Sequence, residues 1–377
     1  MSKLFELISQ SADGKQRAGV LHIGGKDIPT PVFMPVGTQG SVKSIDSSSL
    51  IKTGTKIILG NSYHIYLRAG IEVLKEFGGL KNLMKWNGSM LTDSGGYQVF
   101  SLKDLRKLSE EGVEFRSHID GSKHFFSPEK VIEIQRFIGT DIMMPLDECT
   151  HYPSQLIEAK KSMELTLRWA ERSKQALESS LPMYENEQFL FAIGQGSMFP
   201  ELRRICMKNL VDMDFDGYAI GGLSVGEPLE MMYEMTDVCT DLMPELKPRY
   251  LMGVGTPANI LESISLGIDM FDCVLPTRNA RNGQLFTTKG KINIKNAKYK
   301  FEKNVIDENL QNGVSDYYSL SYLRHLFICG EILGLMMATF HNIAFYQWLM
   351  KTAREKILTN EFRQWKDIFL QNYSEID

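Results

Sequence analysis

The sequence predicts an α/β protein built on a (β/α)8 barrel, with an N-terminal β-ribbon and a C-terminal helical and insertion subdomain. Short apolar runs of strand length recur eight times, and amphipathic segments of helix length separate most of them. This alternation is typical of a barrel of parallel strands rather than of an open sheet. At 377 residues, 43% hydrophobic and 23% charged, the chain is long enough for one such domain with an embellishment.

Residues 1–30 are expected to form the N-terminal β-ribbon. Apolar stretches at residues 5–8 and 18–23 are of strand length, and Gly24 and Gly25 then turn the chain. The barrel core is expected over residues 31–283. Its eight strands are predicted at residues 31–36, 56–61, 89–93, 141–147, 189–195, 217–222, 249–254 and 269–275.

Two of the intervening helices have recognisable first turns. Ser127 is a predicted cap for a helix over residues 127–137 with Pro128 in its first turn, and Pro228 lies in the first turn of a helix predicted over residues 227–242. Beyond the barrel, residues 284–345 are assigned to an insertion subdomain and residues 346–377 to C-terminal helices that close the barrel. The elements expected there are an irregular polar stretch at 305–319 and helices at 322–340, 343–358 and 361–372.

Whole-chain composition gives no sign of a secreted or strongly basic protein. The formal net charge is −4, and the five cysteines have neither the spacing of a disulfide framework nor that of a Cys-x-x-Cys metal site. The N-terminus lacks the apolar core of a signal peptide, and no apolar run reaches membrane-spanning length. We therefore expect a cytoplasmic protein without a membrane partner.

The last predicted strand contains a carboxylate, Asp272, in the run Met-Phe-Asp-Cys-Val-Leu. An unpaired charge buried in a sheet costs several kcal/mol, so this carboxylate needs a partner or a function. Pro276 is expected to end the strand, and residues 277–283 to form a loop whose two arginines suit an anionic substrate. Taken alone, the pattern also fits a structural Asp272 paired locally with Arg278.

Other predicted strands end in polar or glycine residues, at the level where the active site of such a barrel lies. They are Asp93, Asp147, Gln195 and Gly222. An aspartate accepts from N–H groups and a glutamine both donates and accepts, so Asp147 and Gln195 together match the Watson–Crick edge of a guanine-like base. We expect these residues and Asp272 to share one pocket.

Asp93 opens the motif Asp-Ser-Gly-Gly-Tyr-Gln. Gly95 and Gly96 would let the backbone approach a ligand closely, and Tyr97 offers a flat face for a planar one. On its own the motif fits a plain glycine-rich turn equally well. Farther on, residues 278–303 contain eight basic residues and one acidic residue. This local excess predicts a binding surface for a phosphate backbone, with a solvated lysine-rich hairpin as the alternative.

Five motifs are more specific as a set than singly. They are Asp-Ser-Gly-Gly-Tyr-Gln, Asp-Glu-Cys, Gly-Gly-Leu-Ser-Val-Gly-Glu, Tyr-Leu-Met-Gly-Val-Gly-Thr-Pro and Phe-Asp-Cys-Val-Leu-Pro-Thr-Arg-Asn-Ala-Arg-Asn-Gly. In order, and over nearly the whole chain, they resemble the bacterial tRNA-guanine transglycosylases of the queuine tRNA-ribosyltransferase family. The resemblance implies a (β/α)8 glycosyltransferase of queuosine biosynthesis. Such an enzyme exchanges the wobble guanine, position 34, of G-U-N anticodon tRNAs (those for Asp, Asn, His and Tyr) for 7-aminomethyl-7-deazaguanine.

The resemblance also implies roles for residues. Asp272 is the nucleophile that attacks C1′ of the ribose to form a covalent RNA–enzyme intermediate, and Asp93 is the general acid/base for the leaving and incoming bases. Tyr97 and Met252 sandwich a flipped base. The residues implied to bind the base are Asp93, Ser94, Gly95, Gly96, Tyr97, Asp147, Gln195, Gly222, Leu223 and Met252. Those implied to contact RNA are Gly253, Val254, Gly255, Thr256, Pro257, Ala258, Asn259, Thr277, Arg278, Asn279, Ala280 and Arg281.

The chain departs from the family at its structural zinc, which three cysteines and a histidine usually hold. Leu310, Asn312 and Ser315 stand at the cysteine positions, and His341 alone remains. One imidazole cannot hold a structural zinc, so we expect no metal and no other cofactor. We expect an apolar cluster instead. Its members are Leu310, Val314, Tyr317 and Tyr318.

Alternatives remain for the base and for the activity. Val225 stands where queuine-using members have glycine, which favours the small 7-aminomethyl base, with queuine salvage as the alternative. A glycoside hydrolase using Asp93 and Asp272 would leave the basic stretch unexplained. A catalytically silent partner subunit is disfavoured, because such subunits keep the metal site and change the catalytic residues. The expected partners are tRNA, a 7-deazaguanine base and a second copy of the chain in a homodimer.

Overall fold

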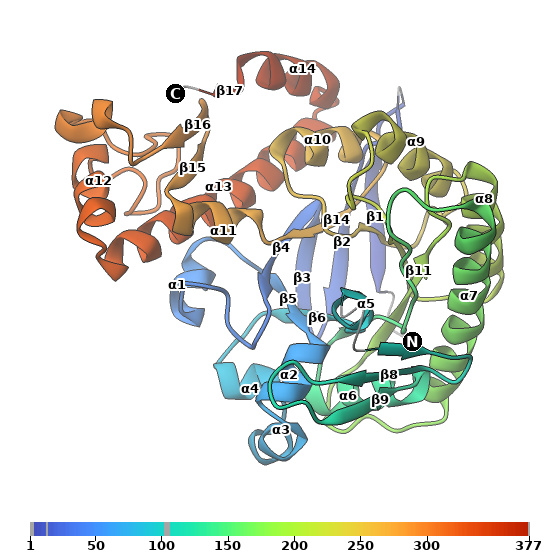
Figure 1. Ribbon diagram of the computed structural model, residues 1–377. Helices are drawn as coiled ribbons and strands as arrows, with labels where there is room; N and C mark the ends of the chain where they lie inside the picture. Colours follow the sequence, from blue (N-terminus) through green and yellow to red (C-terminus); the bar gives the residue numbers. More distant parts are fainter. Residues whose placement is uncertain (1–3, 13, 102–105, 376–377) are drawn as a thin grey trace.

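Eight parallel strands close into a barrel at the centre of the molecule (Figure 1). The computed structural model describes residues 4–12, 14–101 and 106–375. The strands follow one another around the ring in chain order, and the last pairs with the first. They are β4 (Val32–Gly37), β5 (Ile57–Asn61), β6 (Ser89–Asp93), β10 (Ile142–Met143), β11 (Phe189–Gly194), β12 (Gly217–Ile220), β13 (Arg249–Leu251) and β14 (Met270–Cys273). Each coincides with a predicted apolar run, so the (β/α)8 prediction is confirmed.

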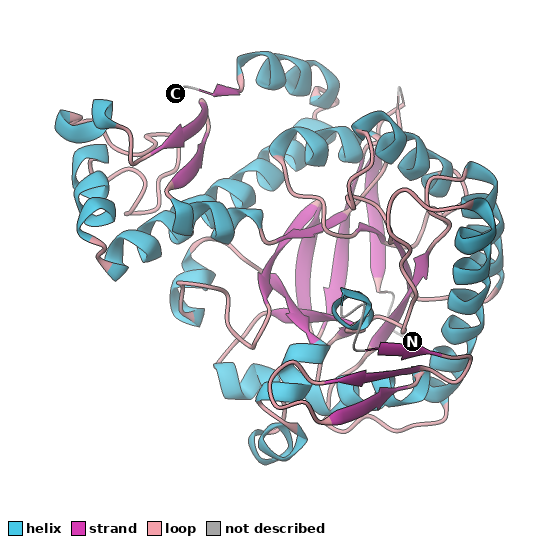
Figure 2. Ribbon diagram, viewed as in Figure 1, coloured by secondary structure: helices cyan, strands magenta, loops and turns pink. Residues whose placement is uncertain are grey.

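Helices surround the barrel (Figure 2). Those before the last strand are α1 (Ser47–Lys52), α2 (Ser62–Arg68), α3 (Ile71–Phe77), α4 (Leu80–Met84), α5 (Gly96–Ser101), α6 (Pro128–Ile138), α7 (Leu156–Glu178), α8 (Pro200–Asp212), α9 (Leu229–Thr240) and α10 (Pro257–Ser265). As predicted, Ser127 caps α6 by accepting from the N–H of Lys130, with Pro128 in the first turn. The α9 helix begins directly after Pro228.

A three-stranded antiparallel sheet, β1 (Phe5–Gln10), β2 (Arg17–Ile23) and β3 (Lys26–Thr30), covers the end of the barrel at which its strands begin. Phe5 and Leu21 of this sheet pack in one cluster with Met34 from the barrel. The fully buried Arg17 forms a two-bond ion pair with Asp269, which directly precedes β14. This end of the barrel is therefore closed, and ligands must enter from the opposite end.

A second antiparallel sheet, which the sequence analysis did not predict, lies between α5 and α6. Its strands are β7 (Arg106–Leu108), β8 (Val113–Arg116) and β9 (Lys123–Phe126). Val113, Phe115 and Phe126 pack with residues of α6 and α7. The strands are three or four residues long and the outer two are mostly exposed. Only the middle strand alternates apolar and charged residues, and four residues are too few for a clear signal.

The segment after β14 is a helix, and the predicted loop at residues 277–283 is therefore wrong. The helix α11 (Leu275–Asn282) carries Pro276 in its first turn, where the missing N–H needs no partner, and ends at Gly283 with φ 89°. The proline does end the strand, as predicted, but it also begins a helix. The two arginines are consequently presented from a helix.

The C-terminal part combines a small sheet with three α-helices and one 3-10 helix. Its elements are β15 (Gln284–Thr287), β16 (Gly290–Asn293), the 3-10 helix η2 (Ala297–Phe301), α12 (Leu320–Cys329), α13 (Ile332–Leu358), α14 (Phe362–Asn372) and β17 (Ser374–Glu375). Residues 305–319 are irregular apart from one isolated bridge, as predicted. The predicted helix break after residue 340 is wrong, because α13 runs unbroken through it and through residue 345. The break lies at Gly330, whose φ of 72° caps α12.

The long helix α13 packs against β4 and completes the ring of helices. The rings of Phe33 and Tyr346 lie 4.6 Å apart, and Gln347 donates to the carbonyl of Phe33 (3.2 Å). Among the described residues, no helix combines the length and apolar character that a membrane crossing needs.

Candidate active site

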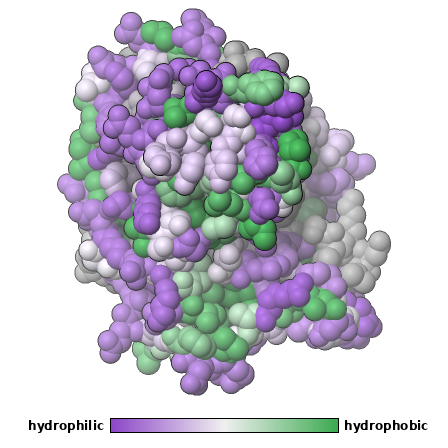
Figure 3. Space-filling model, turned by 90° about the vertical axis from the view of Figure 1, so that its left-hand side faces the viewer, coloured by the Kyte–Doolittle hydropathy of each residue, from purple (hydrophilic) through white to green (hydrophobic). Residues whose placement is uncertain are grey.

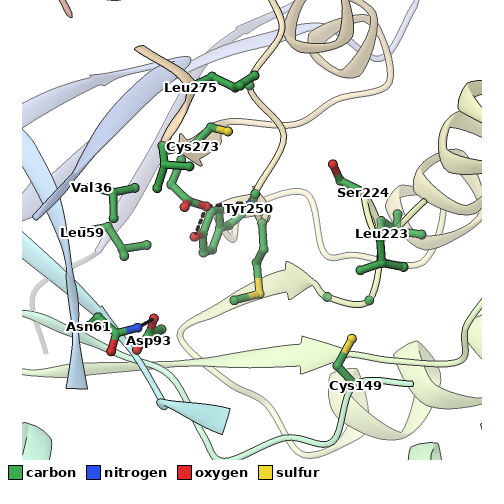
Figure 4. A pocket seen from close by; sticks show the side chains of 18 of the residues that line it. Val36, Leu59, Asn61, Asp93, Cys149, Leu223, Ser224, Tyr250, Cys273 and Leu275 are labelled. Atoms are coloured by element: carbon green, nitrogen blue, oxygen red, sulfur yellow. Dashed lines mark hydrogen bonds between the residues drawn. The ribbon is translucent and has the colours of Figure 1, made fainter. Parts of the chain in front are cut away.

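A cavity of about 610 Å³ opens at the C-terminal ends of the barrel strands (Figure 4). The predicted residues that line it are Asp93, Ser94, Asp147, Gln195, Gly222, Leu223, Met252, Gly253, Gly255, Thr256, Asn259, Asp272 and Arg278. The strand-end residues therefore share one pocket. Their convergence follows from the topology, because parallel strands of a closed barrel all end on the same side.

Asp272 lies on β14 with 9% of its surface exposed. Its Oδ1 accepts from the hydroxyl of Tyr250 (2.6 Å, dashed in Figure 4) and from the N–H of Gly253 (2.8 Å). None of the ion pairs of the described residues joins it to Arg278, so the local pairing considered above does not form. Burial raises the pKa of Asp272, and the two hydrogen bonds oppose that rise. Both bonds go to one oxygen, which leaves the other for a reacting partner.

Asp93 ends β6 directly opposite Asn61, the last residue of β5. Asn61 Nδ2 donates to Oδ2 (2.6 Å), and the N–H groups of Ser62 (3.1 Å) and Gly95 (3.0 Å) donate to Oδ1. Burial nevertheless raises the pKa of Asp93 to about 7, and the nearby charge of Asp272 adds to the rise. A carboxyl group with such a pKa can both give and take a proton near neutral pH.

Asp147 and Gln195 lie together, four residues past β10 and directly past β11. Gln195 Nε2 donates to Asp147 Oδ2 (2.8 Å), and Ser94 Oγ donates to Oδ1 (3.2 Å). Burial raises the pKa of Asp147 to about 6. Gly222 has φ 65°, and a Cβ there would lie 2.4 Å from Gln195 Oε1. Glycine is thus required for the amide to pack against this turn.

The Asp93 motif bends around the carboxylate of Asp147. Ser94 Oγ accepts from the N–H of Gly96 (3.1 Å), and a Cβ on Gly96 would come within 2.9 Å of the Asp147 carbonyl oxygen. Met252 lines the cavity beside them. The side chain of Tyr97, the predicted stacking partner of Met252, lies outside the described residues.

The two segments implied to contact RNA are only partly exposed. In the first, Val254 and Pro257 are buried, and Thr256 caps α10 by accepting from the N–H of Asn259 (3.2 Å). Asn259 also accepts from the hydroxyl of Tyr233 (2.9 Å). Ala258 is partly exposed. The buried side chains of this segment support the loop and do not face a ligand.

The second segment is α11. Thr277 and Ala280 are buried, and Asn279 donates to Gln284 Oε1 (2.6 Å). Arg278 is exposed and lines the cavity, and Arg281 is exposed one turn farther on. Of the two arginines, Arg278 therefore brings its positive charge to the cavity from the exposed face of the helix.

Two supporting residues were not identified from the sequence. Asn61 lies at the end of a predicted strand, so its position could have indicated that it belongs to the site. Tyr250 was buried in a predicted strand, and nothing in the sequence indicated that its hydroxyl faces Asp272. The pairing of β13 with β14 brings the Tyr250 hydroxyl to Asp272.

Asn312, Ser315 and His341, which the resemblance places at a zinc site, form a hydrogen-bonded chain. Ser315 Oγ lies 2.8 Å from His341 Nδ1, and His341 Nε2 lies 2.9 Å from the carbonyl oxygen of Phe286. Asn312 Nδ2 donates to Ser315 Oγ (2.9 Å), and Leu310 is buried. Since the Phe286 carbonyl can only accept, Nε2 carries the proton and Nδ1 accepts from Ser315. Burial lowers the pKa of His341 to about 4, so the imidazole is neutral.

The apolar cluster predicted here does not form as expected. Tyr317 is 73% exposed, and it packs edge-on against Tyr318 rather than over the histidine. A polar network occupies this place instead, because the buried His341 needs partners for both ring nitrogens.

The model of the queuine tRNA-ribosyltransferase family matches residues 12–375. The chain belongs to this family. It is 52% identical over 369 residues to the queuine tRNA-ribosyltransferase of Caldanaerobacter subterraneus subsp. tengcongensis, covering 98% of this chain and 97% of the relative. It is 49% identical to the proteins of the same name from Neisseria meningitidis (96% of each chain) and Francisella tularensis subsp. novicida (98% of each chain). The family resemblance and the transferase class inferred from the sequence are confirmed.

Proposed function

We propose that this protein is a tRNA-guanine transglycosylase that exchanges the wobble guanine of G-U-N anticodon tRNAs for a 7-deazaguanine base in queuosine biosynthesis. The observation that carries the proposal is the pair of carboxylates, Asp93 and Asp272, which face one cavity and are close enough for the charge of one to raise the pKa of the other. We assign the reaction to the cytoplasm, where its tRNA substrate is found.

The chemistry proceeds in two displacements at C1′ of the ribose. The ionised Asp272 forms a bond to C1′ while the bond from C1′ to N9 of guanine breaks, and Asp93 gives its proton to the departing base. The incoming base then loses its N9 proton to Asp93 and bonds to C1′, which releases Asp272. Asp93 is thereby returned to its protonated form, so the proton balance closes over one exchange.

Asp147, Gln195 and Gly222 are assigned to the edge of the base. The carboxylate of Asp147 accepts from N1–H and the 2-amino group, and the amide of Gln195 and the N–H of Gly222 can donate to O6. Gln195 Nε2 donates to Asp147 (2.8 Å), and its second N–H is free to donate to O6 of the base. The bond to Asp147 can therefore hold the amide in place while the base binds.

The incoming base is proposed to be 7-aminomethyl-7-deazaguanine. Val225 lines the cavity, where its side chain reduces the room next to the 7-position substituent. The experiment offers both 7-aminomethyl-7-deazaguanine and queuine to an unmodified G-U-N tRNA and identifies the wobble nucleoside by mass. Incorporation of queuine would refute the size argument, whereas an untouched guanine would refute the transglycosylase function. Val225→Gly should raise queuine use relative to the wild type.

We also propose that the protein needs no zinc. Leu310 offers no donor atom, both nitrogens of His341 are bonded within the protein, and the described residues contain no group of three or more metal-binding side chains. The residues present therefore do not fit the metal. Zinc content near one per chain in purified protein, or loss of exchange on adding a chelator, would refute this proposal.

The homodimer is proposed on the basis of an exposed apolar patch. Ile328 (58% exposed) lies near the end of α12, and Ile332 (71%) and Leu333 (45%) lie at the start of α13. Figure 3, which looks onto this side of the molecule, shows apolar surface in the middle of the face with hydrophilic residues around it. A self-complementary patch is what a two-fold interface requires. A monomeric mass by light scattering, unchanged in Ile332→Glu, would refute the assignment.

A further inference from the structure

We propose that Arg203 is a positioning residue for base recognition, which fixes the two turns that present Gln195 and Gly222 to the base. This inference rests on the proposed function, because it takes the cavity to be a base site. It concerns how the base-reading residues are held in place rather than the chemistry of exchange.

Arg203 lies in the first turn of α8 and is fully buried. Its Nε donates to the carbonyl of Ser197 (2.9 Å), and its Nη1 donates to the carbonyls of Gly194 (2.9 Å) and Gly221 (2.7 Å). Its Nη2 makes a longer bond to the carbonyl of Gly222 (3.4 Å). One guanidinium thus joins the turn after β11 to the turn after β12.

The acceptors of this cation are all neutral. Of the carboxylates that the structure describes, none lies within ion-pair distance of Arg203, although buried charges are usually paired. A planar guanidinium has five N–H donors in a fixed fork, which suits a site where several carbonyl groups converge. Arg203 therefore fixes the backbone of the two turns, which a salt bridge to a carboxylate would not do.

The two turns need such support because their backbones are unfavourable. Ser197 and Gly222 have φ values of 52° and 65°, and the first is costly for a residue with a side chain. Gln195 packs so closely on Gly222 that no Cβ fits between them. A small shift of either turn would move the Gln195 amide away from its 2.8 Å bond to Asp147.

Arg136 is a matched control. It is also a buried arginine, and it also bonds to neutral acceptors: the carbonyls of Leu177 (2.9 Å) and Ser180 (2.8 Å) and the side chain of Gln188 (2.7 Å). Gln188 directly precedes β11, so Arg136 acts at the end of the barrel away from the cavity. Its loss should cost stability alone.

The test compares Arg203→Lys with Arg136→Lys in the exchange of labelled guanine into tRNA. Arg203→Lys should raise KM for guanine about tenfold, the effect of losing one good hydrogen bond, with KM for tRNA unchanged. Arg136→Lys should lower Tm and leave both KM values as in the wild type. If a variant merely contained fewer folded molecules, its apparent kcat would fall and its KM would not change. A rise in KM for guanine therefore distinguishes a loss of positioning from a loss of folding.

Each outcome bears on one proposal. An unchanged KM for guanine in Arg203→Lys would overturn the positioning role, and no exchange by the wild type would overturn the proposed function instead. If Arg203→Lys does not fold, Arg203→Gln is judged by the same criterion. If neither variant folds, Arg203 serves the fold as a whole and the positioning role is overturned.

Discussion

Replacing Tyr250 with phenylalanine should move the acid limb of the pH–rate profile to higher pH. The hydroxyl donates to Asp272 Oδ1 at 2.6 Å, which stabilises the ionised carboxylate and lowers its pKa against the effect of burial. Without the hydroxyl, the pKa of Asp272 rises further. A smaller fraction of Asp272 is then ionised at acidic pH, and only the ionised form can attack C1′.

The size of the shift follows from the strength of the bond. A hydrogen bond to a charged group contributes about 1.5–3 kcal/mol, and 1.36 kcal/mol corresponds to about one pKa unit. The limb should therefore move by about one to two pH units. The lower end is expected, because the N–H of Gly253 still donates to the same oxygen (2.8 Å).

The assay follows formation of the covalent tRNA complex in a single turnover, from about pH 5 to about pH 9, on denaturing gels. Tyr218→Phe is the control, since Tyr218 is also a buried tyrosine on a neighbouring strand but bonds to the N–H of Phe215 in the cluster outside the barrel wall. The reasoning is refuted if the limb stays in place in Tyr250→Phe, or if Tyr218→Phe moves it equally.

The remaining predictions concern single contacts. Since the pKa of Asp93 is raised to about 7, its protonated form is lost above that pH, and the rate of complex formation should fall as the pH rises past about 7. In Asp93→Asn this fall should disappear, and the rate should be about 10²–10⁴-fold lower than in the wild type. Ser315→Ala leaves Nδ1 of the buried His341 without its donor and should cost about 1–3 kcal/mol in urea unfolding, with zinc addition giving no recovery. Asp269→Ala leaves Arg17 buried and unpaired and should cost about 3–5 kcal/mol by the same measurement, whereas a loss under 1 kcal/mol would contradict the burial argument.

The sequence predicted the features that apolar periodicity and strand ends encode. All eight barrel strands and the polar residues after them could be located, because a buried strand leaves a continuous apolar run and its C-terminal end faces the site. Features set by tertiary contacts were missed. Pro276 was interpreted as ending regular structure, although a proline is equally at home in the first turn of a helix.

The hydrogen-bond partners of His341 are another feature that tertiary contacts determine. The family resemblance predicted that three zinc ligands are replaced in this chain, and an apolar substitute was expected. The actual partners, Ser315 and the carbonyl of Phe286, depend on how α13 lies against the insertion. A hydrogen bond between residues 55 positions apart leaves no periodic mark in the chain.

The unbroken α13 helix makes the insertion and the barrel a single cooperative unit. Asn342 bonds to the N–H of Phe286 (3.0 Å) and to the carbonyl of Pro276 (3.0 Å). Three turns farther along the helix, Arg354 donates to the carbonyl of Thr30 (2.6 Å) in the N-terminal sheet. Opening the insertion would therefore strain the helix that supports β4, so amide exchange in α13 should be as slow as in the barrel strands and melting should show one transition.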